Sequence, residues 1–318
     1  MKTTSRITQR AARVVVAFVG ALLTTTLVMP LAPAASASSD RVEHRPDRYL
    51  LALGDSISFG YQGIKVTTPP DPSVFDTGYV DVLGVRYPSM HVTNFSCPGE
   101  TTTTMIAGGC PWSGAGWGLH DEYTGSQLHA AVSFLRAQRR SHGAVTVAIW
   151  GNDILALRVA CEADIACIAE RAPAEIAEFS KRLDTILRAL RAASPSARIA
   201  VLAATHAIPP PTAEIDALYD ALNTAIVATA AASRVRVADP RAVFNPPDAA
   251  ERLAAICAYT LICVTGGADG HPSDAGYRVI AHSFAAVLRR DATGGLSHTG
   301  IPRTTCTSPP QPPTGCVS

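Results

Sequence analysis

Short, almost wholly apolar segments alternate along this chain with amphipathic segments of helical spacing, and this alternation strongly limits the folds it can adopt. Residues 50–53 read Leu-Leu-Ala-Leu, which suits a strand covered on both faces. Strands joined by helices pair in parallel and carry helices on both sides. We therefore predict an α/β protein with a three-layer α/β/α architecture. Further strands are predicted at 91–95, 145–150, 199–203 and 235–238, and helices at 79–85, 126–139, 213–232 and 274–290.

A long amphipathic helix is predicted downstream of Pro173. Proline suits the first turn of a helix, where its missing N–H would have no partner, so we expect the helix to begin there. Its apolar residues follow one another at intervals of three and four, at Ile176, Phe179, Leu183, Ile186, Leu187 and Leu190.

The amino-terminal segment has the three parts of a secretory signal peptide. Basic residues precede an apolar run over 14–29, and Ala35-Ser36-Ala37 offers the small residues of a cleavage site. An uncleaved membrane anchor is the alternative, but the run is shorter than the roughly 20 residues a spanning helix needs. We predict that residues 1–37 are a signal peptide, that the mature chain starts near Ser38, and that the protein is secreted.

The rest of the chain is predicted to form one domain and a tail. Residues 292–318 are rich in Gly, Thr, Ser and Pro and lack apolar periodicity, which is typical of a surface tail. Residues 40–291 are long enough for a single domain with a substantial core. The net charge is +1, with no basic run outside the signal segment, so no nucleic-acid partner is indicated. We expect a monomer.

The eight cysteines fall into four close pairs in sequence order. In an exported chain an even number of cysteines indicates disulfides, although sequence alone cannot prove their connectivity. A metal site is the alternative, but no spacing here matches the short Cys-x-x-Cys spacing of zinc ribbons. We expect sequential pairing, namely Cys97–Cys110, Cys161–Cys167, Cys257–Cys263 and Cys306–Cys316. The first pair would clamp the glycine-rich segment 101–124, a candidate functional loop or lid.

Polar residues follow three of the predicted strands, and these are candidates for a catalytic site. Gly54-Asp55-Ser56, Cys97-Pro98-Gly99 and Gly151-Asn152-Asp153 all lie at carboxyl ends of strands. In a parallel sheet those ends share one edge, where ligands bind. Ser56 is placed to be a nucleophile. The backbone N–H groups of Ser56 and Gly99 and the side-chain amide of Asn152 could form an oxyanion hole.

A base for Ser56 is available near the end of the domain, in Asp269-Gly270-His271-Pro272. His271 would accept the serine proton, and Asp269 would orient the imidazole. Structural roles compete with each assignment. Ser56 and Asn152 could simply cap helices, Gly99 could be a turn glycine, and Asp55 is expected to bind backbone amides.

These blocks resemble the SGNH, or GDSL, hydrolase family. Gly54-Asp55-Ser56, Gly99, Gly151-Asn152-Asp153 and His271-Pro272 occur in the family's order over about 230 residues. The resemblance implies a flavodoxin-like parallel sheet, hydrolysis of esters, and Ser56, Gly99, Asn152 and His271 as the site. Two departures stand out. Trp150 replaces a usual glycine, and Ala268 occupies the position of the usual acid, so Asp269 or a backbone carbonyl would orient His271.

The predicted function is that of a secreted serine esterase or lipase with an acyl-enzyme on Ser56. Such chemistry needs no metal or organic cofactor, so none is expected. The expected partners are small-molecule or lipid esters, with transient contact with a lipid surface. One alternative is a carbohydrate acetyl esterase, in which Trp112 and Trp117 would hold sugars. The other is a non-catalytic binding protein on the same fold.

Overall fold

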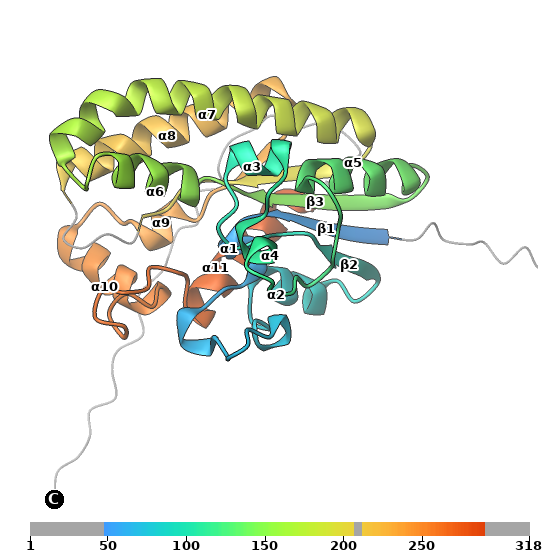
Figure 1. Ribbon diagram of the computed structural model, residues 1–318, viewed down its shortest axis with the longest axis horizontal. Helices are drawn as coiled ribbons and strands as arrows, with labels where there is room; N and C mark the ends of the chain where they lie inside the picture. Colours follow the sequence, from blue (N-terminus) through green and yellow to red (C-terminus); the bar gives the residue numbers. More distant parts are fainter. Residues whose placement is uncertain (1–47, 207–211, 290–318) are drawn as a thin grey trace, which may run out of the picture. The chain divides into compact units, whose positions relative to one another are not determined.

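The computed structural model describes residues 48–206 and 212–289, which form a parallel sheet with helices on both faces (Figure 1). Within this part of the chain five strands pair in the order β2-β1-β3-β4-β5, all in parallel. This is the order of flavodoxin-like sheets, so the predicted three-layer α/β/α fold is confirmed. The strands are β1 (Arg48–Gly54), β2 (Met90–Asn94), β3 (His142–Ala148), β4 (Arg198–Leu202) and β5 (Arg236–Ala238).

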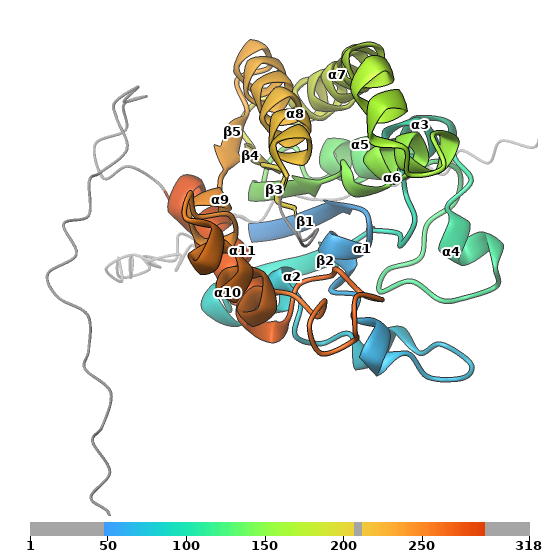
Figure 2. The same cartoon turned by 90° about the vertical axis from the view of Figure 1, so that its left-hand side faces the viewer.

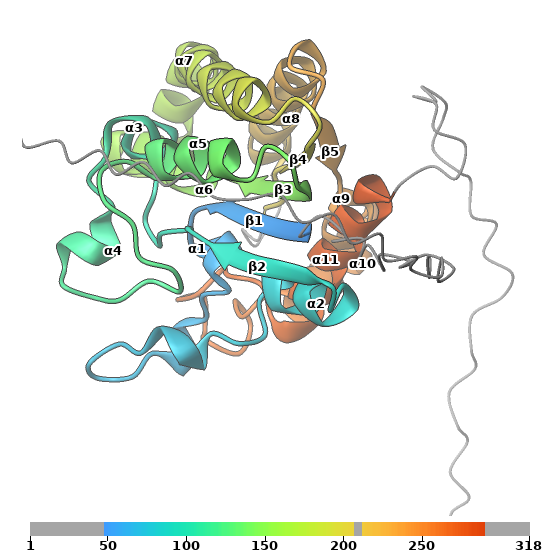
Figure 3. The same ribbon diagram turned by 90° about the vertical axis from the view of Figure 1, so that its right-hand side faces the viewer.

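Helices α5, α7 and α8 cover one face of the sheet, while α2 and α11 cover the other (Figure 3). Among the described residues, no helix is both long enough and apolar enough to cross a bilayer. The helices are α1 (Ser56–Phe59), α2 (Tyr79–Arg86), α3 (Thr102–Ala107), α4 (Pro111–Gly114), α5 (Gln127–Ala137), α6 (Gly151–Ala160), α7 (Ile165–Ala193), α8 (Ala213–Ala232), α9 (Arg241–Phe244), α10 (Ala249–Tyr259) and α11 (Asp274–Leu288), with short 3-10 turns at Gly63–Lys65 and Pro72–Val74.

The side chains of β1 show why this strand is apolar at nearly every position. Leu51 and Leu53 pack into the core beneath α5, α7 and α8, whereas Leu50 and Ala52 pack against α2 and α11. All four are buried. Burying a leucine side chain contributes roughly 1.5–3 kcal/mol, so both faces of the strand stabilise the fold.

The expectation that the long helix begins at Pro173 is wrong. α7 begins at Ile165, and Pro173 lies inside it. The side chain of Asp164 caps this earlier start by accepting a hydrogen bond from the Cys167 N–H at 2.8 Å. The Cys161–Cys167 disulfide then ties the first turn of α7 to the end of α6. Local capping and covalent linkage therefore outweigh the hydrogen bond that an interior proline removes.

The other predicted elements are present, with ends that differ by a few residues. The segment 101–124, expected to be a loop, contains the short helices α3 and α4. Three of the expected cysteine pairs are disulfides, Cys97–Cys110, Cys161–Cys167 and Cys257–Cys263. The expected Cys306–Cys316 pair, the signal peptide 1–37 and the tail 292–318 lie outside the described residues.

The turn that ends β1 requires glycine at position 54. Gly54 has a φ of +133°, and a Cβ built there would lie 1.9 Å from the carbonyl oxygen of Ala148 on β3. The next residue, Asp55, donates its backbone N–H to that same oxygen at 3.0 Å. The backbone of the turn therefore lies directly against the end of β3, in space that only glycine leaves free.

We expect Gly54→Ala to destabilise the protein far more than a glycine substitution at an open turn. Gly116→Ala is the matched control, because Gly116 also has a positive φ, +83°, but nothing lies within 4 Å of its Cβ position. Backbone strain alone costs about 1–3 kcal/mol, and steric overlap adds a similar amount for Gly54. Urea unfolding followed by circular dichroism measures both free energies. Equal losses in the two variants would contradict the steric argument.

Candidate active site

Ser56 occupies the first position of α1, directly after the turn that ends β1. Asp55 caps this helix, because its carboxylate accepts the N–H of Ile57 at 2.9 Å. The Ser56 side chain is partly exposed, in contrast to residues 49–55 before it, which are buried. The local sequence thus brings the chain out of the core and presents one hydroxyl at the carboxyl edge of the sheet.

His271 lies in the loop between α10 and α11, and this loop runs beside α1 (Figure 2). Two backbone hydrogen bonds hold the residues around it. Leu261 donates to the His271 carbonyl at 2.9 Å, and Ser273 donates to the Tyr259 carbonyl at 2.9 Å. Just upstream, the Cys257–Cys263 disulfide joins α10 to the segment that follows it. The loop that carries the imidazole is therefore anchored at its base on the end of α10.

The structure brings Ser56, His271 and Asp269 into one hydrogen-bonded chain. Ser56 Oγ lies 2.8 Å from Nε2 of His271, and Nδ1 of His271 lies 2.6 Å from Oδ1 of Asp269. An ionised carboxylate can only accept, so Nδ1 carries the hydrogen and Nε2 presents its lone pair to the serine hydroxyl. This is the arrangement in which an imidazole can take the serine proton.

Asp269 is held in place from several sides. Its Oδ1 also accepts the backbone N–H of His271 at 2.9 Å, and its Oδ2 accepts the N–H of Gly63 at 2.7 Å. A Cβ on Gly63 would lie only 2.8 Å from Oδ2, so glycine permits this approach. Burial opposes ionisation of the carboxyl, but the hydrogen bonds from His271 and Gly63 outweigh it and lower the pKa of Asp269. The acid beside the imidazole is accordingly a carboxylate.

Two further candidate oxyanion donors, Gly99 and Asn152, lie in the segments that follow β2 and β3. Gly99 has a φ of +86°, and the neighbouring Cys97 N–H binds the carbonyl of Gly54 at 3.0 Å. Asn152 lies in the first turn of α6 and donates from Nδ2 to the Glu100 carbonyl at 2.9 Å. A primary amide has two N–H groups, so Asn152 keeps a second donor after this bond.

Asp55 has the structural role that was expected for it. It is only 1% exposed, and its carboxyl accepts backbone N–H groups of Ile57, Trp150 and Gly151. Burial raises the pKa of Asp55 to about 6 in spite of these bonds and of the nearby His271. The side chain thereby joins α1, the helix that begins with Ser56, to the start of α6, where Asn152 lies.

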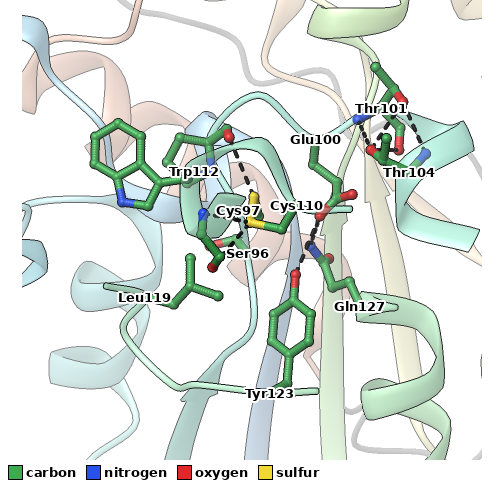
Figure 4. The surroundings of a disulfide bond; sticks show 12 residues. Ser96, Cys97, Glu100, Thr101, Thr104, Cys110, Trp112, Leu119, Tyr123 and Gln127 are labelled. Carbon is green, nitrogen blue, oxygen red and sulfur yellow. Dashed lines mark hydrogen bonds between the residues drawn. A yellow bond between two sulfur atoms is a disulfide. The ribbon is translucent and has the colours of Figure 1, made fainter. Parts of the chain in front are cut away.

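Sequence reasoning missed Gln127 and Glu100, two buried side chains that hydrogen-bond to each other close to the Cys97–Cys110 disulfide (Figure 4). The Gln127 side chain accepts the Gly54 N–H at 2.6 Å and donates both to the Gly54 carbonyl at 3.0 Å and to Glu100 Oε2 at 3.1 Å. Tyr123 also donates to Glu100 Oε2, at 3.4 Å. Glu100 directly follows Gly99, a predicted site residue, and this position could have indicated a role near the site. Nothing in the sequence indicated that Gln127 is buried.

Glu100 also lies close to the Cys97–Cys110 disulfide. The two sulfur atoms are bonded to each other and so offer no thiolate to a metal ion. Glu100 is 1% exposed, and burial raises the pKa of its carboxyl to about 7, against hydrogen bonds from Thr104, Tyr123 and Gln127 that favour ionisation.

A cavity of about 390 Å³ opens beside Ser56, Asn152 and His271. Trp150, found where the family pattern has a glycine, forms part of its wall and is almost fully buried. Apolar side chains also line it, from Ile57, Ile154, Leu155, Phe244 and Ile262, beside polar residues that include Thr205, Thr260 and Arg158. The described residues that line this cavity include neither Trp112 nor Trp117. Trp112 instead packs with Phe59 and Phe75 in a separate buried cluster.

Comparisons with known proteins show the family and the fold of this chain. The model of the GDSL-like lipase/acylhydrolase family matches residues 52–279, which include Ser56 and His271. The chain therefore belongs to this family. No curated protein matches it.

Solved structures show the same fold. An extracellular lipase from Streptomyces rimosus superposes with a TM-score of 0.54 and 16% identity, covering 76% of this chain and 100% of the lipase chain. A phospholipase A1 from Streptomyces albidoflavus has a TM-score of 0.50 and 18% identity, covering 76% and 98% of the respective chains.

The raised pKa of Glu100 predicts a pH dependence of stability. The folded chain holds this proton more tightly than the unfolded chain, whose glutamate has a pKa of about 4.3, so the free energy of unfolding falls as pH rises from about 4.5 to 7. Glu100→Gln mimics the neutral acid and should reduce this slope by up to about 1 kcal/mol per pH unit. Asp55 contributes in the same direction and remains in the variant.

Urea unfolding at a series of pH values measures this effect. Glu170→Gln, which removes an exposed carboxylate on α7, serves as the control and should keep the wild-type slope. The assignment of the slope to Glu100 fails if Glu100→Gln and the control give the same pH dependence.

Proposed function

We propose that this protein is a secreted serine esterase or lipase that hydrolyses carboxylic esters through an acyl-enzyme on Ser56. The observation that carries the proposal is the continuous hydrogen-bonded chain from Ser56 Oγ through His271 to Asp269, at 2.8 and 2.6 Å. Membership of the GDSL-like lipase/acylhydrolase family supports the reaction class.

In the proposed acylation step, Ser56 Oγ attacks the ester carbonyl while Nε2 of His271 takes the hydroxyl proton. Asp269 keeps Nδ1 protonated and stabilises the imidazolium that forms. The backbone N–H groups of Ser56 and Gly99 and the second N–H of Asn152 would donate to the developing oxyanion. His271 then gives its proton to the leaving alcohol, and the acyl group stays on Ser56.

Deacylation repeats the same proton transfers with water in place of the serine hydroxyl. His271 takes a proton from the water, which attacks the acyl-enzyme, and returns it to Ser56 as the acid departs. In this scheme His271 carries every proton, Asp269 stabilises the imidazolium, and the proposed donors stabilise the oxyanion. Fixed groups of this kind need little reorganisation during the reaction.

The proposed substrates are esters with an apolar acyl group. Support comes from the cavity wall, where Ile57, Ile154, Leu155, Phe244 and Ile262 offer apolar surface next to Ser56. The alternative of a carbohydrate acetyl esterase relied on Trp112 and Trp117 as sugar platforms. Trp112 is buried among other aromatic side chains, and Trp117, which is 38% exposed, packs against it. A series of p-nitrophenyl esters of increasing length, measured beside acetylated xylan, separates the two.

Export is part of the proposal. Three disulfides among the described residues suit an oxidising compartment, as does the predicted signal peptide. Transient contact with a lipid surface, a monomeric state and independence from cofactors are proposed with it.

Ser56→Ala should abolish turnover of short p-nitrophenyl esters, by roughly 10⁴-fold or more, because it removes the nucleophile. The fold should survive, because the Ser56 hydroxyl does not support the backbone. An unchanged circular dichroism spectrum would show this. A fluorophosphonate probe should label the wild type and not the variant. Retained turnover by folded Ser56→Ala protein would refute the acyl-enzyme, and an unlabelled wild type would favour a non-catalytic binding protein.

Asp269→Asn should lower kcat by about 10³- to 10⁴-fold, because an amide that donates to Nδ1 forces the hydrogen onto Nε2 and removes the base. Asp153→Asn is the control. Its carboxylate binds Thr102 and Arg182, away from the imidazole, so a far smaller loss is expected. Steady-state kinetics on one p-nitrophenyl ester compares them. Small and equal losses would indicate that another group, such as a backbone carbonyl, orients His271.

A further inference from the structure

The catalytic cavity contains one charged group that the proposed reaction leaves unused. The ionisable residues in its wall are Asp55, Arg158, Tyr219 and His271. Asp55 is buried against backbone amides, and His271 is engaged by Ser56 and Asp269. Tyr219 is a neutral phenol whose pKa burial raises to about 12. The remaining group, the guanidinium of Arg158, is the cation that this wall presents to a substrate.

The guanidinium of Arg158 forms no hydrogen bond or ion pair with the residues that the structure describes. Other arginines nearby are committed to carboxylates. Arg182 binds Asp153, and Nη1 of Arg252 donates to both carboxylate oxygens of Asp216, at 2.8 and 2.7 Å. Asp216, on the adjacent helix α8, also contacts His206 and so has its charge balanced. Arg158 is exposed to solvent, with its donors open to a ligand.

Helix α6 places Arg158 at a defined distance from the reacting centre. Gly151, Ile154, Leu155 and Arg158 all line the cavity, and their spacing of three and four puts them on one side of the helix. Asn152, the candidate oxyanion donor, lies in the first turn, and Arg158 lies in the last. Six residues of α-helix rise about 9 Å. The backbone positions of Asn152 and Arg158 on this wall are therefore nearly two helical turns apart.

Arg158 on α6 and Tyr219 on α8 line the same cavity. The charge of the guanidinium opposes the rise that burial causes in the pKa of the Tyr219 phenol. Tyr219 lines the same cavity and packs edge-on against Trp150, with ring centroids 5.9 Å apart. An anionic group held by Arg158 would therefore lie at the α6–α8 end of the cavity.

We propose that the preferred substrate is an ester bearing a phosphate or carboxylate several bonds from the scissile carbonyl, and that Arg158 binds this anion. This inference rests on the proposed esterase function and adds the charge class of the substrate. A guanidinium suits the task because its planar fork binds phosphate or carboxylate through two parallel hydrogen bonds. The apolar side chains on the same wall would hold the uncharged part of the substrate.

Two matched pairs of soluble esters test the proposal and locate the anion. Monohexanoylglycerol and its phosphate ester, hexanoyl lysophosphatidate, differ by a phosphate on the alcohol side. The p-nitrophenyl ester of hexanoic acid and the mono-p-nitrophenyl ester of adipic acid differ by a carboxylate on the acyl side. Within each pair the scissile ester is the same, so the ratio of kcat/KM reports on recognition of the charge.

The wild type should favour the anionic member of at least one pair. Arg158→Gln should lower kcat/KM for that anionic ester by about 10- to 100-fold, chiefly through KM, the effect of losing a charge-assisted hydrogen bond. The neutral partner should change by less than about twofold. Arg158→Lys should retain part of the preference. Arg136→Gln, which removes an exposed arginine on α5, is the matched control and should alter neither ester.

The inference is overturned if the wild type shows no anionic preference in either pair, or if Arg158→Gln affects neutral and anionic esters equally. The second result would make Arg158 a structural or solvated surface residue. Failure of the proposed function has a different signature, namely no turnover of neutral p-nitrophenyl hexanoate and no fluorophosphonate labelling of Ser56. The two hypotheses can therefore fail separately.

Discussion

The close contact between the end of β1 and the end of β3 is the constraint on which the candidate site depends. Gly54 lies against the Ala148 carbonyl, and Asp55 donates to the same oxygen. Because the chain turns there without a side chain, α1 starts immediately and its first residue is Ser56. The position of Ser56, the proposed nucleophile, is thus set by backbone packing between two adjacent strands. A rigid scaffold of this kind is well suited to holding a reactive group at the edge of a sheet.

The remaining groups are held by hydrogen bonds from side chains to the backbone of distant segments. Gln127 binds both the N–H and the carbonyl of Gly54, and Asp269 accepts the N–H of Gly63. Asn152 binds the Glu100 carbonyl, which joins the loop after β3 to the loop after β2. Each of these bonds links segments far apart in sequence. Their combined effect is to fix the loops that carry the candidate catalytic groups, rather than the groups alone.

The predictions that held were those in which local sequence and global fold point the same way. Leu50 to Leu53 had to be a strand buried on both faces, and three cysteine pairs were close enough in sequence to be joined within one loop each. The predicted start of α7 was wrong because it relied on the preference of Pro173 for the first turn of a helix. The cap at Asp164 and the Cys161–Cys167 disulfide, which lie upstream, start the helix earlier. Capping and covalent linkage outweighed the preference of proline for a helix start.

The sequence alone indicated the succession of strands and helices along the chain and the apolar core of the sheet. It also indicated Ser56, His271 and Asp269 as candidates for the site. These follow from periodicity and from the chemistry of single side chains, which are local properties. Only the tertiary structure decided that Asp269 reaches Nδ1 of His271, that Gln127 and Glu100 are buried and hydrogen-bond to each other, and that Arg158 borders the cavity. Those are relations between segments that meet only when the sheet forms and its loops pack together, and no local pattern encodes the distances between them.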